Sequence, residues 1–118
     1  MVLVDRKEIT VRFSEVDSMN IVWHGHYLKY FEDGREAFGN KFNIGYLDVY
    51  KHNVMIPIVK VDCEYKRPLV YGDKGIVETT FINSESAKIM FGYKIFRQPD
   101  QEVIATGKSM QVFLTPEG

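Results

Sequence analysis

Several features are absent from this 118-residue sequence, and each absence excludes a class of protein. There is one cysteine, Cys63, so no disulfide can form within the chain, which favours a reducing compartment. The formal net charge is -1, without the basic surplus that binding to nucleic acid would require. No apolar run approaches the roughly 20 residues that a membrane span needs, and the N-terminal MVLVDRKE lacks the apolar block of a signal peptide. We therefore expect a cytoplasmic protein that binds neither nucleic acid nor membrane.

The length and composition fit one globular domain. No repeat, low-complexity stretch or linker divides the sequence, and its length allows a single core. The composition is 45% hydrophobic, 26% charged and 14% aromatic, which is typical of globular chains and outside the range of disordered segments. Residues 1–118 are therefore predicted to form a single domain.

From about His26 onward the sequence has the periodicity of an amphipathic helix. Its apolar stripe consists of Tyr27, Phe31, Gly34 and Phe38. Charged residues fill the other positions, and Glu32 and Arg35 are spaced closely enough to form an ion pair. Gly39-Asn40 is a suitable C-terminal stop. A short turn or helical piece is expected around Tyr46 to Tyr50.

Strand patterns account for most of the remaining sequence. Alternation of polar and apolar residues predicts a first strand at Glu8 to Phe13, and a second between Pro57 and Pro68. Three further strands are predicted at Gly75 to Asn83, Ala87 to Arg97 and Glu102 to Thr115. The predicted order is one strand, a long helix and four consecutive antiparallel strands.

The lengths of these elements limit how they can pack. The last strands are about 9 to 13 residues long, against a usual 5 or 6, and a helix of about 14 residues measures only ~21 Å. A flat sheet would leave much apolar surface uncovered by one helix. We therefore predict an α+β fold in which a curved antiparallel sheet of about five strands wraps the helix. The apolar surface that remains predicts self-association.

The segment VRFSEVDSMNIVWHGHYLKYFEDGREAF, residues 11–38, resembles the opening motif of hotdog-fold acyl-CoA thioesterases of the 4-hydroxybenzoyl-CoA thioesterase type. The matching positions are Arg12, Asp17, Val22, Trp23, Tyr27, Glu32 and Arg35. The later VDCEYKRPLVYGD, residues 61–73, resembles the second-strand signature of the family, in which a Tyr and a Pro precede a Gly-Asp turn. The likeness spans nearly the whole chain and preserves the order of elements.

The resemblance implies a hotdog fold, a homo-oligomer that is a dimer or a tetramer, and active sites at the dimer interface. It also implies that Asp17 is the catalytic carboxylate, which acts on the thioester carbonyl as nucleophile or as general base toward water. The sequence leaves both routes open. It also leaves open the acyl group and the choice between CoA and acyl carrier protein as the thiol carrier.

The residues before the helix suit this chemistry, which needs an attacking oxygen and donors for the charge that develops on the carbonyl oxygen. The first N–H groups of a helix lack partners and carry the positive end of its dipole. Those near His24 and Gly25 are therefore candidates for an oxyanion hole, and Gly25 lets a substrate approach the backbone closely. Asp17 lies seven residues before His24, on a loop that can return its carboxylate to this position. Either route requires an ionised Asp17.

Further site residues are predicted around the same helix start. His24 either orients Asp17, polarises the carbonyl or donates to the substrate, or is a half-exposed histidine near the helix cap. His26 stands where relatives often carry Asn, and there a structural role competes with substrate binding. The predicted substrate-binding residues are Val22, Trp23, His26, Tyr27, Lys66, Arg67 and Lys88. The last three are candidates for the CoA phosphates, with the alternative that each is a solvated surface charge.

Three other residues of the loop carry expectations. Glu15 is interpreted as a solvated loop charge. Asn20 replaces a glycine that is common in the family, and asparagine tolerates the left-handed backbone conformation that the loop would need. Met19 is bulkier than usual and would reshape the acyl pocket. The chemistry needs no metal or cofactor, and a His-x-His pair alone is a weak metal motif, so none is predicted.

The sequence therefore predicts an acyl-CoA thioesterase that converts a thioester and water into a carboxylate and a free thiol. One alternative is a hotdog hydratase or dehydratase that acts on enoyl thioesters. The other is a non-catalytic acyl-thioester binding protein that keeps the fold for ligand capture. Asp17→Asn separates catalysis from binding, because it should abolish hydrolysis and leave ligand affinity largely intact.

Overall fold

The computed structural model describes residues 3–42, 56–82 and 88–113. In chain order the elements are β1 (Val4–Thr10), the 3-10 turn η1 (Phe13–Glu15), α1 (His26–Lys41), β2 (Ile58–Tyr65), β3 (Lys74–Ile82), β4 (Lys88–Gln98) and β5 (Glu102–Val112). The turn or helical piece expected around Tyr46 to Tyr50 lies outside the described residues. Among the helices that are described, none has the length and apolar run that a membrane crossing requires.

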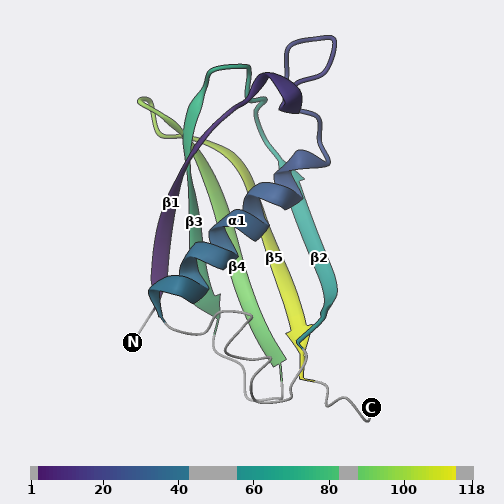
Figure 1. Cartoon of the computed structure of the whole chain (residues 1–118), viewed down its shortest axis with the longest axis vertical. Coiled ribbons are helices and arrows are strands. Elements are labelled where there is room, and N and C mark those ends of the chain that lie inside the picture. Colours follow the sequence, from purple (N-terminus) through teal and green to yellow (C-terminus); the bar gives the residue numbers. More distant parts are fainter. Residues whose placement is uncertain (1–2, 43–55, 83–87, 114–118) are drawn as a thin grey trace.

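The five strands form one antiparallel sheet in the order β1-β3-β4-β5-β2. The two strands that flank α1 in sequence, β1 and β2, are thus the two edges of the sheet. The helix runs diagonally across one face (Figure 1). The predicted α+β architecture, one long helix against a five-stranded antiparallel sheet, is confirmed.

The first strand differs from the prediction, because it lies at Val4–Thr10 instead of Glu8 to Phe13. The chain leaves the sheet at Val11, whose N–H donates to the carbonyl of Asp73 at 2.9 Å. Arg12 then begins η1, and its N–H donates to Oε1 of Glu15 at 2.8 Å. The alternating pattern continued past the strand because Val11 remains buried in the core.

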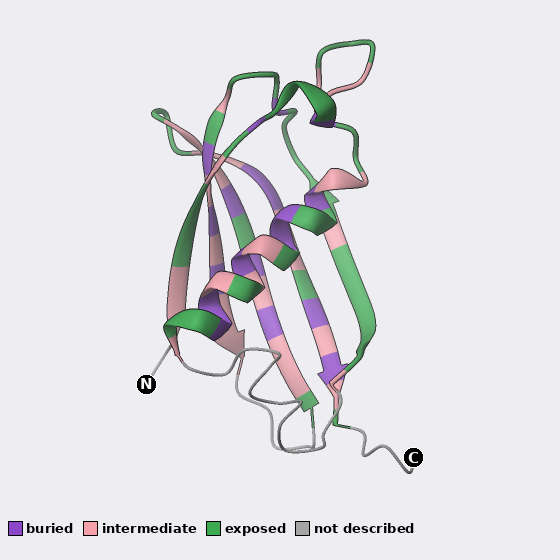
Figure 2. Cartoon of the chain, viewed as in Figure 1, coloured by how far each residue is buried: buried purple, intermediate pink, exposed green. Residues whose placement is uncertain are grey.

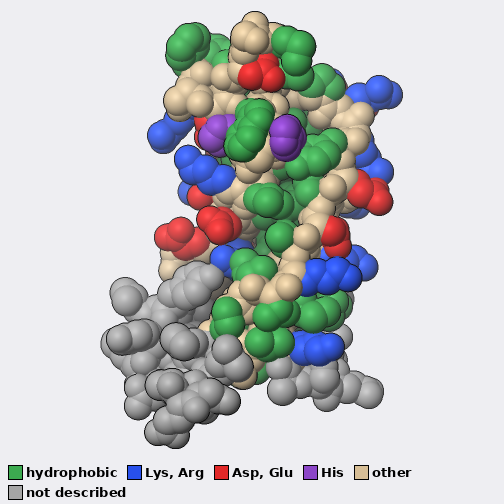
Figure 3. All heavy atoms as spheres, turned by 90° about the vertical axis from the view of Figure 1, so that its right-hand side faces the viewer, with side chains coloured by type: hydrophobic (Ala, Val, Ile, Leu, Met, Phe, Trp, Pro, Cys, Tyr) green, Lys and Arg blue, Asp and Glu red, His purple; other side chains and the backbone are tan. Residues whose placement is uncertain are grey.

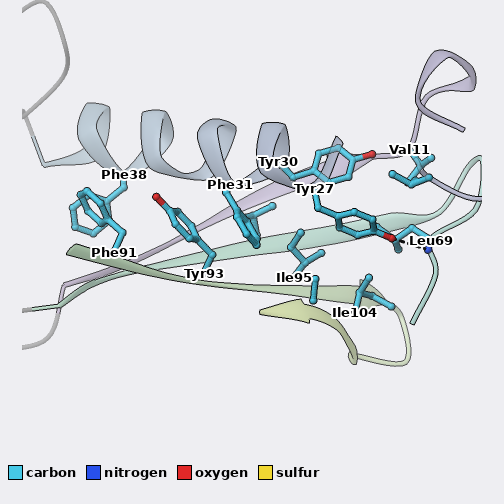
Figure 4. Close-up of a cluster of buried hydrophobic side chains, with 13 residues drawn as sticks. Val11, Tyr27, Tyr30, Phe31, Phe38, Leu69, Phe91, Tyr93, Ile95 and Ile104 are labelled. Atoms are coloured by element: carbon cyan, nitrogen blue, oxygen red, sulfur yellow. Dashed lines mark hydrogen bonds between the residues drawn. The ribbon is translucent and has the colours of Figure 1, made fainter. Parts of the chain in front are cut away.

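The core lies between α1 and the sheet, and the predicted apolar stripe of the helix is buried in it (Figure 2). Phe31 stacks on Tyr93 of β4 with ring centroids 4.6 Å apart, and Phe38 packs edge-on against Phe91 at 5.1 Å. Figure 4 shows these helix side chains pointing at the strands. Glu32 and Arg35 lie about one turn apart on α1, and the ion pair between them stays a prediction.

Gly34 lets α1 approach β3 closely, which yields a prediction about stability. A Cβ at this position would lie 2.6 Å from Oγ1 of Thr79 and 2.7 Å from Cγ1 of Val77. We expect Gly34→Ala to lower the free energy of unfolding by about 1–3 kcal/mol, because overpacking outweighs the better helix propensity of alanine. Urea denaturation of this variant and of Asn40→Ala, at an exposed position of the same helix, checks the expectation. A gain in stability in both variants would contradict it.

Candidate active site

The loop between η1 and α1 is a small hairpin that carries Asp17. Val16 and Val22 form an isolated antiparallel bridge, and the N–H of Asp17 donates to the carbonyl of Ile21 at 2.9 Å. A second bridge, between Ile21 and Val70, and a 2.8 Å hydrogen bond from Val22 to Leu69 attach the loop to the segment before β3. The loop therefore has a defined position against the body of the domain.

Asp17 is partly buried at the beginning of this hairpin loop. Its Oδ1 accepts a hydrogen bond from the N–H of Met19 at 2.8 Å, and its carbonyl accepts one from Asn20 at 3.0 Å. Asn20 has a φ of 62°, so the predicted left-handed conformation is confirmed. Within the described ranges, Oδ2 of Asp17 accepts no hydrogen bond. One carboxylate oxygen thus shapes the loop, and the other is available to a ligand.

Glu15 is buried, with 6% of its surface exposed, so its interpretation as a solvated charge is wrong. Its Oε1 accepts hydrogen bonds from the N–H of Arg12 at 2.8 Å and from the hydroxyl of Tyr30 at 3.0 Å. Its main-chain carbonyl accepts from the N–H of Trp23 at 3.0 Å. Burial and the bond to Glu15 raise the pKa of Tyr30, which keeps this donor protonated. Glu15 therefore ties η1, the start of α1 and the Asp17 loop together.

The turn Trp23–Gly25 leads into α1 and leaves two N–H groups unpaired. No side chain caps the helix at Gly25. The N–H of His26 donates to the carbonyl of Trp23 at 2.9 Å, and that of Tyr27 donates to the carbonyl of His24 at 3.4 Å. In the part of the chain that the structure describes, the N–H groups of His24 and Gly25 meet no acceptor. The turn can therefore donate to an anionic oxygen at the positive end of the helix dipole.

The ring of Trp23 contacts the rings of His24 and His26, and Figure 3 shows the two histidines on one face of the molecule with apolar side chains between them. The distance between ring centroids is 4.9 Å to His24 and 5.7 Å to His26. The indole is 51% exposed and lies over Gly25, so that a Cβ at position 25 would run into it. Glycine is therefore needed here for the packing of Trp23.

Two predicted substrate-binding residues lie beneath this surface. Val22 is 4% exposed and Tyr27 is 3% exposed, so both side chains belong to the core. The hydroxyl of Tyr27 accepts a hydrogen bond from the N–H of Leu69 at 3.4 Å (Figure 4), and burial raises its pKa. The structure thus brings Asp17, Trp23 and the two histidines to one end of the domain, with Val22 and Tyr27 packed below them.

The sequence pattern predicts only that Tyr65 lies in a strand. In the structure its side chain also reaches this end of the domain. Its hydroxyl donates to the carbonyl of His24 at 3.0 Å, and its ring packs edge-on against Tyr27 with a centroid distance of 5.1 Å. The alternation in β2 gives the spacing of this side chain along the strand. It does not give the contact with His24, which is 41 residues away in sequence.

The three predicted phosphate-binding residues are not together. Lys66 and Arg67 follow β2 and line a surface cleft with Gln101, Glu102 and Val103. Arg67 pairs with Glu102 at 3.2 Å and Lys66 with Glu64 at 3.5 Å, so each has an acidic partner. Lys88 pairs with Val112 of β5, whereas Tyr65 pairs with Ala105 of the same strand, seven residues away. At about 3.4 Å per residue, Lys88 is roughly 24 Å along the sheet from Tyr65.

The arrangement at the helix start can perform a defined kind of chemistry. Asp17 offers a carboxylate oxygen for attack or for proton abstraction, and the His24 and Gly25 N–H groups can stabilise negative charge on a carbonyl oxygen. Within residues 3–42, 56–82 and 88–113, no three His, Cys, Asp or Glu side chains cluster as in a metal site.

Comparisons with known proteins agree with this chemistry. The profile of the Thioesterase-like superfamily matches residues 11–117. The candidate acyl-CoA thioesterase YneP of Bacillus subtilis is 39% identical over 93 residues, which cover 79% of this chain and 67% of YneP. The chloroplastic acyl-acyl carrier protein thioesterase ATL3 of Arabidopsis thaliana is 30% identical over 107 residues, which cover 91% of this chain and 56% of ATL3. The DHNA-CoA thioesterase of Staphylococcus aureus superposes with a TM-score of 0.87 at 26% identity, over 95% of this chain and 74% of that one.

Proposed function

Since this chain belongs to the thioesterase-like superfamily and has its hotdog fold, we propose that it hydrolyses an acyl-CoA thioester to a carboxylate and a free thiol. The observation that carries the proposal is the position of Asp17, with one free carboxylate oxygen, on the loop that leads to two unpaired N–H groups at the start of α1. Similarity to proteins named as CoA thioesterases and as an acyl-carrier-protein thioesterase supports this reaction class. Acyl-carrier-protein thioesters are the second candidate substrates.

In the proposed mechanism, the free oxygen of Asp17 acts on the thioester carbonyl in one of two ways. As a general base it takes a proton from water, whose oxygen bonds to the carbonyl carbon while the C–S bond breaks and the thiolate takes up a proton. As a nucleophile it bonds to the carbonyl carbon while the C–S bond breaks and the thiolate leaves and takes up a proton, and water then hydrolyses the resulting anhydride to the carboxylate product and free Asp17. Both routes begin from the ionised carboxylate.

The unpaired N–H groups of His24 and Gly25 would hold the oxyanion that forms on the thioester oxygen. A donor of this kind is typically worth about 2.7–4 kcal/mol at the transition state. We propose that the acyl thioester binds against the exposed rings of Trp23 and His24 and the half-buried ring of His26. Val22 and Tyr27, which are buried below, would support those rings rather than touch the substrate.

We propose that the site is completed by a second copy of the chain, joined through β2. This edge strand exposes apolar side chains, with 56% of Val59, 41% of Val61 and 52% of Tyr65 accessible. In an antiparallel pairing centred on Val61, Lys60 of each chain would face Asp62 of the other. Edge strands that are this long and expose apolar side chains are normally paired or covered. A tetramer would be a pair of such dimers.

The same pairing would bring Lys88 to the site of the other chain. Two β2 edges that pair antiparallel place opposite ends of the two sheets side by side. The end of one chain that carries Lys88 then lies beside the end of the partner that carries Asp17. We therefore propose that Lys88 serves the CoA phosphates in the partner's site. Lys66 and Arg67, already paired with glutamates, would contribute less.

This assembly makes a testable prediction. Val61→Lys places two like charges opposite each other at the centre of the proposed β2–β2 contact, so we expect it to convert the dimer into a monomer and to reduce turnover at least about tenfold. Light scattering after size exclusion, together with the activity assay, provides the measurement. Phe13→Lys, at the 77% exposed Phe13 away from β2, is the control. A wild-type chain that is an active monomer would refute the proposed assembly.

A reducing compartment suits the single thiol of the chain. Burial raises the pKa of Cys63, so the thiol remains protonated at neutral pH. We therefore propose a cytoplasmic location.

The proposed function is tested with a panel of short-chain, long-chain and aromatic acyl-CoA substrates and one acyl-carrier-protein thioester, by release of free thiol. We expect turnover with at least one acyl class. Tight binding of a thioester without thiol release would favour the binding protein instead. With an enoyl-CoA in the same panel, loss of the enoyl double bond without thiol release would favour the hydratase.

A further inference from the structure

The hydroxyl of Tyr65 connects the edge strand β2 to the turn that begins the proposed oxyanion hole. It donates to the carbonyl of His24 at 3.0 Å. The ring packs edge-on against the rings of Tyr27 and His24, with centroid distances of 5.1 and 6.4 Å. With 52% of its surface exposed, Tyr65 is not a core residue. Its most specific interaction is therefore the hydrogen bond to the turn.

The other hydrogen bonds of the turn, from the N–H of Trp23 to Glu15 and from the N–H of His26 to Trp23, do not involve the carbonyl of His24. The helix has no side-chain cap at Gly25, where Ser, Thr, Asp or Asn would normally supply one. The intrahelical bond to the His24 carbonyl, from the N–H of Tyr27, is long at 3.4 Å. The shortest hydrogen bond to that carbonyl among the described residues is the one from Tyr65.

The geometry of the peptide group links this bond to the site. A trans peptide unit is planar, and its C=O and N–H point in opposite directions. The carbonyl of His24 and the N–H of Gly25 belong to one such unit, so a donor that fixes the first also fixes the direction of the second. A hydrogen bond accepted by the carbonyl also polarises the amide, which strengthens its N–H as a donor.

We propose that Tyr65 is a positioning residue for thioester hydrolysis, which orients and polarises the Gly25 N–H through the His24 carbonyl. The inference rests on the proposed function, because the Gly25 N–H matters only if it holds an oxyanion. Partial burial raises the pKa of the Tyr65 hydroxyl, so it remains a donor in the neutral range. The neighbouring thiol of Cys63 is a weaker acceptor than a backbone carbonyl, which leaves His24 as the better partner.

The variant Tyr65→Phe removes the hydroxyl and leaves the ring. We expect kcat to fall about 3- to 10-fold with KM unchanged, because the lost interaction acts on charge that develops only in the transition state. Affinity for a thioether analogue of the substrate, which lacks the carbonyl oxygen, should not change. Tyr71→Phe is the matched control, since Tyr71 is also 52% exposed and its hydroxyl has no hydrogen bond among the described residues.

A second measurement tests the same inference without catalysis. The amide resonance of Gly25 in a ¹⁵N–¹H spectrum should shift in Tyr65→Phe and stay in place in Tyr71→Phe. An unchanged Gly25 resonance, a kcat within twofold of wild type, or a higher KM at unchanged kcat would overturn the proposal. A wild-type chain that hydrolyses no thioester would overturn the proposed function instead, and the resonance would still decide whether Tyr65 orients the amide.

Discussion

Asp17→Asn is expected to lower kcat for thioester hydrolysis by about 10²- to 10⁴-fold, the usual contribution of a positioned acid–base group. The asparagine keeps the size of the side chain, and its amide oxygen can still accept the 2.8 Å hydrogen bond from Met19 that shapes the loop. It can neither attack a carbonyl as an anion nor take a proton from water. Release of free thiol under single-turnover conditions measures the loss.

The control for this variant is Asp73→Asn. Asp73 is also a loop aspartate whose Oδ2 accepts a hydrogen bond from a backbone N–H, that of Val70 at 3.0 Å. We expect it to retain activity, while both variants keep their affinity for a non-hydrolysable thioether analogue. Hydrolysis by Asp17→Asn within tenfold of wild type would mean that the carboxylate takes no part in the reaction.

Glu15→Ala is expected to lower the free energy of unfolding by about 2–4 kcal/mol, the largest effect on stability that we predict. The substitution leaves the hydroxyl of Tyr30 buried without its acceptor and removes the carboxylate that caps the N–H of Arg12. Glu15→Gln retains an acceptor oxygen, so it should lose only about 1 kcal/mol. Urea denaturation of both variants gives the values.

Glu8→Ala, at an exposed position of β1, serves as the control and should change the stability by less than about 0.5 kcal/mol. If Glu15→Ala were as stable as Glu8→Ala, the carboxylate would not hold the loop to the helix. The alanine variant should also lose activity, because Asp17 lies only two residues further along the chain.

Periodicity was sufficient to predict the helix and the order of the strands. Residues such as Phe31 and Phe38 recur on one face, and that local pattern is what the core requires. The predicted first strand lies too far toward the C-terminus. Val11 continues the alternation of polar and apolar residues, but its N–H donates to the carbonyl of Asp73, which lies outside the sheet. Burial and strand pairing produce the same pattern in sequence, so the end of this strand could not be read from it.

The site was predicted less completely, because its missing parts depend on contacts between distant residues. Glu15 is buried with the hydroxyl of Tyr30 and the N–H of Arg12 as its donors, and the contact with Tyr30, 15 residues away, cannot be read from the local pattern. The bond from Tyr65 to His24 depends on the pairing of β2 with β5. The distance of Lys88 from Tyr65 follows from the strand register, which the sequence does not specify.

The most direct test of the central claim is a crystal structure of the Asp17→Asn variant with an intact acyl-CoA substrate bound. We expect a thioester oxygen about 3 Å from the backbone nitrogens of His24 and Gly25. We also expect that the side chain at position 17 faces the carbonyl carbon, and that a second chain closes the site through β2. A thioester bound away from this turn, or a side chain at position 17 that points into bulk solvent, would contradict the proposed mechanism.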